Sequence, residues 1–374
     1  MPKVTYLLGA GASAEALPVV SQFNEHLNEF KTFITDWINA EQTLRNEHEN
    51  IPNSLTKQFI DTLNEIIAQE RKHYSIDTYA KKLMLSGKEK EYKKLKSILI
   101  CYFLFEQTSK NGYYPKNPDI SNPKSDAYQL RKKLESKILQ TLDKRYDAFF
   151  ATLLTRKNNT LELPKDINII SWNYDNQFEL SYSEFANQSL AKSVKNLGIL
   201  SNPTIPDQSC NPQIIKMNGT AYSELINSEN YRQLRGNKLI NLSLNFEPST
   251  IQDWIDIFNS LHMAENISFF SFAWETNFET DQRIKIATEK LNKTDSLVVI
   301  GYSFPYYNME VDKLLLSSLK EKTKIYIQDQ PERLETLVDR LTYFGIEKSQ
   351  IHTVKQTDLF FIPPEYIGQQ QKFS

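Results

Sequence analysis

The chain opens with a short apolar segment, Val4 to Leu8, that runs directly into the small-residue sequence Gly9-Ala10-Gly11-Ala12-Ser13-Ala14. A β-prone run that stops at glycine predicts a strand followed by a tight turn, and Ser13 is a suitable cap for a helix beginning there. The spacing fits the G-x-G-x-x-A pattern of dinucleotide sites, where the backbone approaches a pyrophosphate and a helix N-terminus faces it. The alternative is that these small residues serve only the packing of the turn.

An ordinary dehydrogenase also needs a second strand that ends in an acidic residue about 20 residues after the turn, where it holds a ribose. In this chain the region from Glu25 to Phe33 carries apolar residues at helical spacing instead. A dinucleotide bound at this turn must therefore be held in a different way.

The second half of the chain alternates short apolar runs with amphipathic stretches. The predicted strands are Ile167–Trp172, Gln213–Met217, Ile267–Phe272, Ser296–Ile300 and Lys324–Ile327. The predicted helices are Thr250–Ala264, Arg283–Leu291, Met309–Leu319 and Glu332–Tyr343. Such alternation predicts an α/β fold, with a Rossmann-like parallel sheet and crossover helices.

Between the first strand and the second lies a long region with apolar residues at helical spacing, far longer than an ordinary crossover. We therefore predict a Rossmann-like domain made of residues 1–20 and 166–374. Residues 21–165 are predicted to form an inserted helical subdomain, with a long helix from about Ser125 to Thr152.

Composition excludes several classes of protein. The 44 basic and 46 acidic residues give a net charge of −2, so we expect no direct, sequence-specific binding of nucleic acid. Cys101 and Cys210 lie too far apart in sequence to begin a four-ligand zinc site, so no metal is expected. No apolar run approaches the roughly 20 residues that cross a bilayer, and the apolar stretch at the N-terminus is too short for a signal peptide. We expect a soluble, cytoplasmic protein with no membrane partner.

Polar side chains follow the predicted strand Ile167–Trp172, where Asn173 and Asp175 come directly after it. In an open α/β sheet, the carboxyl ends of the strands line the ligand crevice. An amide offers both a donor and an acceptor, and a carboxylate offers acceptors. The alternative is that both residues cap the helix that follows.

Three further strand ends carry candidate residues. Asn218 and Gly219 follow one strand, Gly301-Tyr302-Ser303 follows the most apolar one, and Asp329 follows the last. A glycine and then a hydroxyl at a strand end suit a contact to ribose or phosphate, and Asp329 could reach an adenine or a ribose. A simple turn is the alternative for the first two, because Asn and Gly are common turn residues.

No histidine follows a predicted strand next to a glycine turn, so all five are interpreted as surface or core residues. They are His26, His48, His73, His262 and His352. Neither an HExxH sequence nor a Walker A sequence is present.

The order of these pieces resembles the SIR2-like (sirtuin-related) family, particularly the short prokaryotic SIR2 domains of antiphage defence systems. The motifs are Gly9–Ser13, Trp172-Asn173-Tyr174-Asp175, Asn218-Gly219-Thr220, Gly301-Tyr302-Ser303 and the strand that ends in Asp329. The match covers most of the chain as scattered motifs, and the helical insertion is the part least matched.

The resemblance implies an NAD+ site. The residues that it assigns to the dinucleotide are Gly9, Ala10, Gly11, Ala12, Ser13, Pro18, Asp175, Gly219, Gly301, Tyr302, Ser303 and Asp329. Asn173 and Asp175 would line the nicotinamide pocket. Pro18 resembles the proline of the sirtuin cofactor loop, but the acidic and basic residues expected next are missing from Val19–Gln22.

Two departures from the family narrow the expected activity. The zinc-binding cysteine quartet is absent, and Asn218 stands where the family has its catalytic His. An amide cannot act as a general base near neutral pH, although it can orient a water or a ribose hydroxyl. Deacetylation is therefore not expected. Hydrolysis of the glycosidic bond demands less, with Asn173 and Asn218 as the catalytic residues.

The resemblance thus implies an NAD+ glycohydrolase that releases nicotinamide and ADP-ribose and depletes NAD+ in antiphage defence once a partner activates it. The alternative is a catalytically weak, NAD+- or nucleotide-binding regulatory module of a defence complex. Because the sequence shows no sensor or ATPase domain, we expect a homo-oligomer and a separate partner subunit, either an ATPase/helicase or an argonaute-like sensor.

Overall fold

A computed structural model describes residues 2–44, 54–107, 142–158, 160–201, 212–221, 251–263, 267 and 269–370. The chain divides into two compact units, which are described separately. Unit 1 comprises Met1–Glu15, Leu142–Thr220 and Ser271–Ser374, and unit 2 comprises Ala16–Thr141 and Ala221–Phe270. This division departs from the predicted 21–165 insertion, because the segment from Leu142 packs with unit 1 and unit 2 takes a second piece of chain. The chain therefore passes between the units four times.

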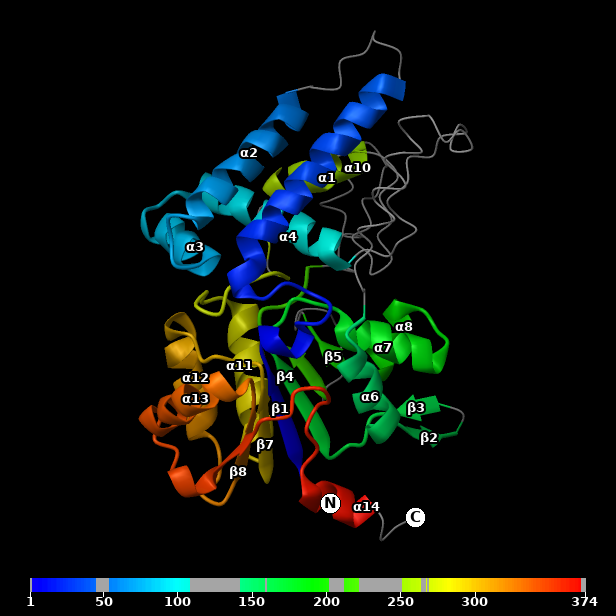
Figure 1. Ribbon diagram of the computed structural model, residues 1–374, viewed down its shortest axis with the longest axis vertical. Coiled ribbons are helices and arrows are strands. Elements are labelled where there is room, and N and C mark those ends of the chain that lie inside the picture. Colours follow the sequence, from blue (N-terminus) through cyan, green and yellow to red (C-terminus); the bar gives the residue numbers. More distant parts are fainter. Residues whose placement is uncertain are drawn as a thin grey trace. The chain divides into compact units, whose positions relative to one another are not determined.

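Unit 1 is built on a seven-stranded parallel sheet, in the order β5-β6-β4-β1-β7-β8-β9 (Figure 1). The strands are β1 (Val4–Leu8), β4 (Ile167–Ser171), β5 (Ile199–Leu200), β6 (Ile214–Lys216), β7 (Ser296–Ile300), β8 (Lys324–Gln328) and β9 (Ile351–Val354). The predicted α/β fold with a parallel sheet is confirmed. From β1 the chain continues to β4, β5 and β6 on one side, whereas β7, β8 and β9 follow one another on the other side, so the direction of strand order reverses between β1 and β7.

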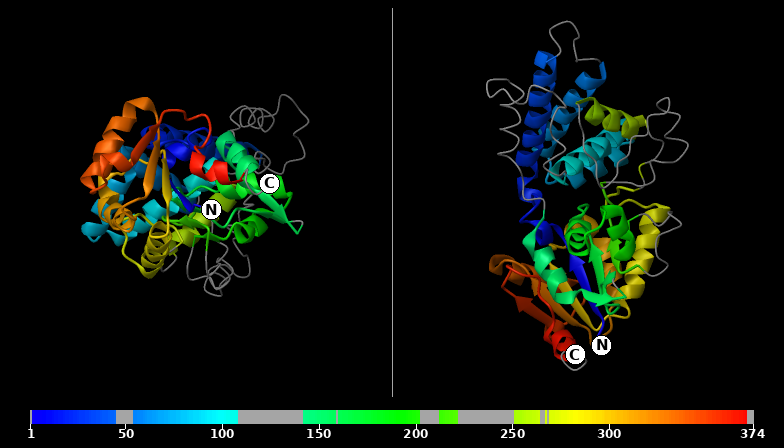
Figure 2. Two further views of the ribbon diagram at one scale, coloured as in Figure 1. Left: turned by 90° about the horizontal axis from the view of Figure 1, so that it is seen from below. Right: turned by 90° about the vertical axis from the view of Figure 1, so that its right-hand side faces the viewer.

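Helices lie on both faces of this sheet (Figure 2). They are α6 (Lys144–Leu153), α7 (Gln177–Ala186), α8 (Leu190–Asn196), α11 (Phe278–Leu291), α12 (Met309–Ser317), α13 (Pro331–Tyr343) and α14 (Pro364–Gln370). The side chains of alternate residues of β1 pack into hydrophobic cores on opposite faces of the sheet. Leu7 joins a cluster with residues of α11, α12 and α13, whereas the Tyr6 ring meets Phe149 of α6 edge-on at 5.0 Å. Strands buried on both faces have mostly apolar sequences, and apolar residues dominate β1 and β4 despite Thr5 and Asn168.

Unit 2 is helical in the part that the structure describes. Its helices are α1 (Phe23–Leu44), α2 (Ser54–Glu70), α3 (Ile76–Leu85), α4 (Glu89–Gln107) and α10 (Ile251–Met263). The apolar stripe of α1 is buried at Phe30, Ile34 and Trp37, and the Phe30 ring lies 5.6 Å from that of Trp254 on α10. Across the described ranges, no helix is both long and apolar enough to cross a membrane.

Several local predictions need correction. The run Ile267–Phe272 was expected to be a strand, but its described residues join no strand of the sheet, and Ser271 N instead donates to Asn218 O at 2.9 Å. Strands β5 and β9 and the antiparallel hairpin of β2 (Thr155–Lys157) with β3 (Thr160–Glu162) were not predicted. The first part of the helix expected from Ser125 lies outside the described residues, and α6 begins at Lys144, where Asp143 caps Arg145 N.

Candidate functional site

The turn after β1 does not open an α-helix, contrary to the sequence prediction. Ala10–Ser13 forms a short 3-10 turn, and the next α-helix, α1, belongs to unit 2. The turn is fastened to the neighbouring strand end, since Gly9 N donates to Ile300 O at 3.1 Å and Gly11 N donates to Gly301 O at 3.0 Å. The expected attraction of a phosphate to a helix dipole therefore has no structural basis here.

The glycines of this turn are required by the close approach of two backbones. A Cβ on Gly11 would lie 2.7 Å from Gly301 Cα, and a Cβ on Gly301 would lie 2.4 Å from Gly11 C. Gly301 also has a φ of +59°, which is the left-handed region that glycine tolerates best. These glycines join the turns after β1 and β7 at the place where the strand order reverses, which is where open α/β sheets bind ligands.

Ser13 lies at the centre of a buried polar network beneath the turn. Its Oγ is 2.7 Å from Asp175 Oδ2, 2.8 Å from the Tyr146 hydroxyl and 3.2 Å from Asn173 Nδ2. A hydroxyl has one proton to donate and two lone pairs to accept with, so these three partners use its full capacity. The predicted contact of the Ser13 hydroxyl with a cofactor does not fit this geometry, and we interpret Ser13 as a residue that organises the site.

Asn173 connects the end of β4 to the turn after β1. Its Nδ2 donates to Gly9 O at 2.9 Å as well as to Ser13, and its own backbone N donates to Ser171 Oγ at 3.1 Å. The side chain therefore does not cap α7, which was the alternative interpretation. It lies at the strand end expected from the sequence, with only 9% of its surface exposed.

Asp175 has both a capping role and a role in the network. Oδ1 accepts the backbone N–H of Gln177, the first residue of α7, at 3.2 Å, while Oδ2 accepts the Ser13 hydroxyl. Beneath it, Lys216 Nζ donates to the Asp175 carbonyl oxygen and lies 3.3 Å from Glu179 Oε2. The Lys216 and Glu179 side chains are fully buried, so this ion pair joins the end of β6 to α7 inside the protein, and the bond to the Asp175 carbonyl joins β6 to the segment that follows β4.

Asn218 follows β6 and lies one strand away from Asn173. Its Nδ2 donates to Trp172 O at 2.9 Å, whereas its Oδ1 is buried and has no hydrogen-bond partner among the residues that the structure describes. A buried amide oxygen without a partner is costly, so this position favours a ligand or water that can donate to it. Gly219 makes the next turn with a φ of +73°, and its N–H returns to Lys216 O at 3.0 Å.

The first turn of α6 contributes residues that sequence reasoning did not identify. Arg145 Nη2 donates to Gly11 O at 3.1 Å and to Ala12 O at 3.2 Å, and the same guanidinium bonds Asp143 through Nε at 2.9 Å. Burial lowers the pKa of Arg145, but the hydrogen bond and charge of Asp143 outweigh this and raise it overall. The arginine thus stays charged and clamps the turn. No sequence pattern predicted this contact, because Arg145 lies more than 130 positions from Gly11 and Ala12 in the chain.

The Tyr146 hydroxyl is held in its neutral form. Burial, and then the nearby charge of Asp175, raise the pKa of Tyr146 well above its ordinary value. The phenol therefore remains a hydrogen-bond donor across the physiological pH range.

The end of β7 has a different character. Tyr302 stacks on Trp172 with ring centroids 5.8 Å apart, and its hydroxyl donates to both oxygens of Asp312 at 2.9 Å. Asn308 Nδ2 donates to that hydroxyl at 2.8 Å. The phenol is therefore committed to the core, while Ser303 is exposed. Burial raises the pKa of Asp312 well above its ordinary value.

The remaining predicted residues are less closely connected to this network. Asp329, after β8, is buried, and its Oδ1 accepts the N–H of Gln330 at 2.7 Å. Pro18 belongs to unit 2, whereas the turn belongs to unit 1. Ala10 is exposed on the turn.

The described histidines take no part in the network. His26, His73 and His262 belong to unit 2, and His352 lies on β9, where it stacks with Tyr326 at 5.1 Å. His48 lies outside the described residues.

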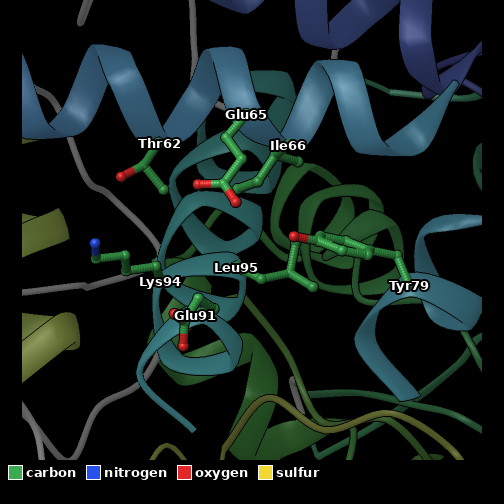
Figure 3. Close-up of a pocket in the computed structure, with 7 residues that line it drawn as sticks. All are labelled: Thr62, Glu65, Ile66, Tyr79, Glu91, Lys94 and Leu95. Carbon is green, nitrogen blue, oxygen red and sulfur yellow. The ribbon is translucent and has the colours of Figure 1, made fainter. Parts of the chain in front are cut away.

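A pocket in unit 2 is shown in Figure 3. It has a volume of 10 Å³ and is lined by side chains of α2, α3 and α4, among them Glu65, Tyr79 and Lys94. A space of this size holds about one water molecule, so it offers no room for a nucleotide. Within the residues that the structure describes, no group of three or more His, Cys, Asp or Glu side chains is arranged to hold a metal ion.

The site thus consists of Asn173, Asp175 and Asn218, which follow two adjacent strands, and the glycine turn that Ser13, Arg145 and Tyr146 hold in place. Comparison with protein-family models, curated proteins and solved structures finds no significant match to this chain.

Proposed function

We propose that this protein is an NAD+ glycohydrolase of the SIR2-like type, which hydrolyses NAD+ to nicotinamide and ADP-ribose. The observation that carries the proposal is the grouping of two amides and a carboxylate at the ends of β4 and β6. These ends adjoin the glycine turn of β1, next to the reversal in strand order. A ligand crevice is expected at this position of an open α/β sheet.

The reaction needs little from the protein beyond positioning. The bond between the nicotinamide nitrogen and the ribose C1′ breaks, nicotinamide leaves as a neutral base, and a water adds its oxygen to C1′ and releases a proton. The transition state resembles an oxocarbenium ion, so it carries positive charge on the ribose. Asn173 and Asn218 would orient the water or the ribose hydroxyls, and Asp175 would accept a hydrogen bond from the nicotinamide carboxamide.

The dinucleotide would be held mainly by backbone. In this proposal Gly9 to Ala12 and Gly219 let the chain approach the phosphates and ribose, while Gly301 and Ser303 contact them from the end of β7. Asp329 would take the second ribose or the adenine. Tyr302 would act through its packing against Trp172, because its hydroxyl is committed to Asp312.

The direct test is to incubate the purified protein with NAD+ and to measure free nicotinamide. We expect Asn173→Ala to reduce the cleavage rate by at least about 100-fold, since misplacing a reacting group costs rate on this scale. Asn218→Ala should cost less. The matched control is Asn292→Ala, at an exposed asparagine at the end of α11, which should cleave like the wild type. Equal rates for Asn173→Ala and the wild type would contradict the proposal.

A binding module remains the second candidate, and one observation favours it. Both oxygens of Asp175 already accept hydrogen bonds, and no histidine of the described chain joins the network, so a general base is not evident. A module of this kind would bind NAD+ with measurable affinity yet release no nicotinamide over hours. Calorimetric binding combined with the nicotinamide assay separates the two candidates.

The resemblance further suggests that cleavage is restrained until a partner signals infection. In this proposal the chain forms a homo-oligomer and joins a separate ATPase/helicase or argonaute-like subunit. Adding the protein product of a neighbouring gene to the nicotinamide assay tests this, and an increase in rate on addition is the expected result.

A further inference from the structure

The buried network around Ser13 fixes the direction of every hydrogen bond within it. Two of its members serve as acceptors: the Asp175 carboxylate, which accepts from Ser13, and the carbonyl oxygen of Gly9, which has no proton to donate. Because Ser13 Oγ lies 2.7 Å from Asp175 Oδ2, its one proton must go to that carboxylate. The remaining two positions on Ser13 Oγ are therefore acceptors.

Because Ser13 donates its proton to Asp175, its other two partners must donate to Ser13 Oγ. The Tyr146 hydroxyl, 2.8 Å away, must donate to Ser13, which agrees with a phenol that stays protonated. The Asn173 amide, at 3.2 Å, must turn its NH2 group toward Ser13. The NH2 group of Asn173 also donates to Gly9 O at 2.9 Å, which requires the same orientation. Two acceptors, Ser13 Oγ and Gly9 O, therefore exclude the flipped amide, in which Oδ1 and Nδ2 exchange places.

Both N–H bonds of Asn173 are thereby used within the protein. Its Oδ1 receives no hydrogen bond from any residue that the structure describes, and it is left to face a ligand. Asn218 repeats the pattern, with Nδ2 bound to Trp172 O and Oδ1 buried without a partner in the described part of the chain. The two amides thus present oxygen atoms, which accept hydrogen bonds and carry partial negative charge.

We propose that Ser13 and Tyr146 are positioning residues that lock the Asn173 amide with its oxygen toward the substrate, so that the site offers acceptors only. This inference rests on the proposed glycohydrolase function and specifies the partial negative charge that the site places next to the ribose. Amide oxygens can hold a water by its hydrogens, which leaves a lone pair of the water free for C1′. They also favour the positive charge that develops on the ribose.

The kinetic test uses Ser13→Ala, which removes one acceptor of the Asn173 amide and the donor of Asp175. We expect kcat to fall about 100-fold while KM for NAD+ and the Kd of ADP-ribose change less than about threefold, as for a group that acts on positioning. Tyr146→Phe should lower kcat about tenfold. The matched control is Tyr182→Phe on α7, another buried tyrosine whose hydroxyl is bonded, to Leu161 O, and which lies outside the network. It should leave kcat unchanged.

A second measurement does not depend on cleavage. In protein labelled with ¹⁵N-asparagine, the side-chain NH2 signals of Asn173, assigned by their loss in Asn173→Asp, should exchange with solvent far more slowly than those of exposed Asn292. Ser13→Ala should abolish that protection. The comparison of Asn173 with Asn292 is made within the wild-type protein, so it does not depend on whether Ser13→Ala folds.

The outcomes separate the two proposals. If the wild type releases no nicotinamide but the Asn173 amide is protected, the glycohydrolase proposal fails and the locked network stands. If the wild type cleaves NAD+ and Ser13→Ala retains its kcat, or if the Asn173 amide exchanges as fast as that of Asn292, the positioning proposal is wrong.

Discussion

Two buried carboxylates lie near the carboxyl ends of the strands, and each accepts a hydrogen bond from a hydroxyl. Asp175 is paired with Ser13 at 2.7 Å on the β1/β4 side, and Asp312 is paired with Tyr302 at 2.9 Å on the β7 side. The Asp175 pair extends to a backbone N–H, a second hydroxyl and an amide with a free oxygen. Both oxygens of Asp312 accept from the single hydroxyl of Tyr302, and burial raises the pKa of Asp312.

The difference shows that burial and a hydroxyl partner do not by themselves define a site. The Asp175 pair is connected to the ends of β1 and β4, where a ligand crevice is expected. The Asp312 pair is enclosed by the core, because Tyr302 stacks on Trp172 and also accepts from Asn308. We therefore assign chemistry to the first pair and a packing role to the second, and four experiments test that assignment.

The largest effect is expected where the two sides meet, at Gly301. In Gly301→Ala the new Cβ would lie 2.4 Å from Gly11 C, in addition to the strain of a φ of +59°. Overpacking and left-handed strain together should lower the free energy of unfolding by about 3 kcal/mol. Gly345→Ala is the matched control, because Gly345 has a φ of +90° but no atom within 4 Å of its Cβ position. It should lose only about 1 kcal/mol. Equal losses in urea unfolding would show that the two turns are not tightly joined.

The next effect compares the carboxylates directly. Asp175→Asn should weaken NAD+ binding by about 1.5–3 kcal/mol, the usual value of a hydrogen bond to a charged group. It should leave ADP-ribose binding unchanged, since that ligand lacks the nicotinamide. Asp312→Asn should change neither affinity. Calorimetric titration of both ligands checks this, and an equal loss for NAD+ and ADP-ribose would make Asp175 a structural cap.

A smaller effect concerns stability as a function of pH. The pKa of Asp312 is higher in the folded protein than in the unfolded chain, so its stabilising contribution is complete below the unfolded value near 4 and is lost as the pH rises through the folded value. Asp312→Asn removes this loss. The variant should therefore gain stability relative to the wild type as the pH increases from 4 to 8. Parallel urea titrations measure the difference, and a constant difference would contradict the burial of a titrating Asp312.

The smallest expected effect is an absence of change. Because no histidine of the described chain joins the Asn173 network, the rate of NAD+ cleavage should show no step near pH 6.5, the ordinary histidine value. A step that disappears when one of the five histidines is replaced would place the catalytic group elsewhere.

The sequence predicted the central strands well and the peripheral ones poorly. Strands β1, β4, β7 and β8 are buried along almost all of their length, so apolar residues dominate their sequences, with few polar interruptions such as Thr5 and Asn168. Strand β5 spans only Ile199–Leu200, and β9 is an edge strand of mixed exposure, so neither leaves such a pattern. The run from Ile267 to Phe272 shows the opposite error, since apolar content alone does not distinguish a strand from a buried loop.

For the candidate site, the sequence located the residues but not their partners. Asn173, Asp175 and Asn218 could be placed because parallel strands end on the same side of a sheet. The bonds of Ser13 to Tyr146 and of Arg145 to the glycine turn connect residues more than a hundred positions apart. No local spacing rule reports such contacts, so the locked amide became visible only in the folded protein.

The central position of β1 has a consequence for synthesis. This strand is synthesised well before its partners, since Val4 pairs with Ile167 on one side and with Ser296 on the other. Long-range parallel pairing of this kind is slow, because loop closure precedes any gain from the contacts. The apolar sequence from Val4 to Leu8 therefore stays without its partners until most of the chain has been made. A nascent chain in this state exposes an unpaired strand to aggregation, so we expect its yield to depend on chaperones that cover this apolar segment.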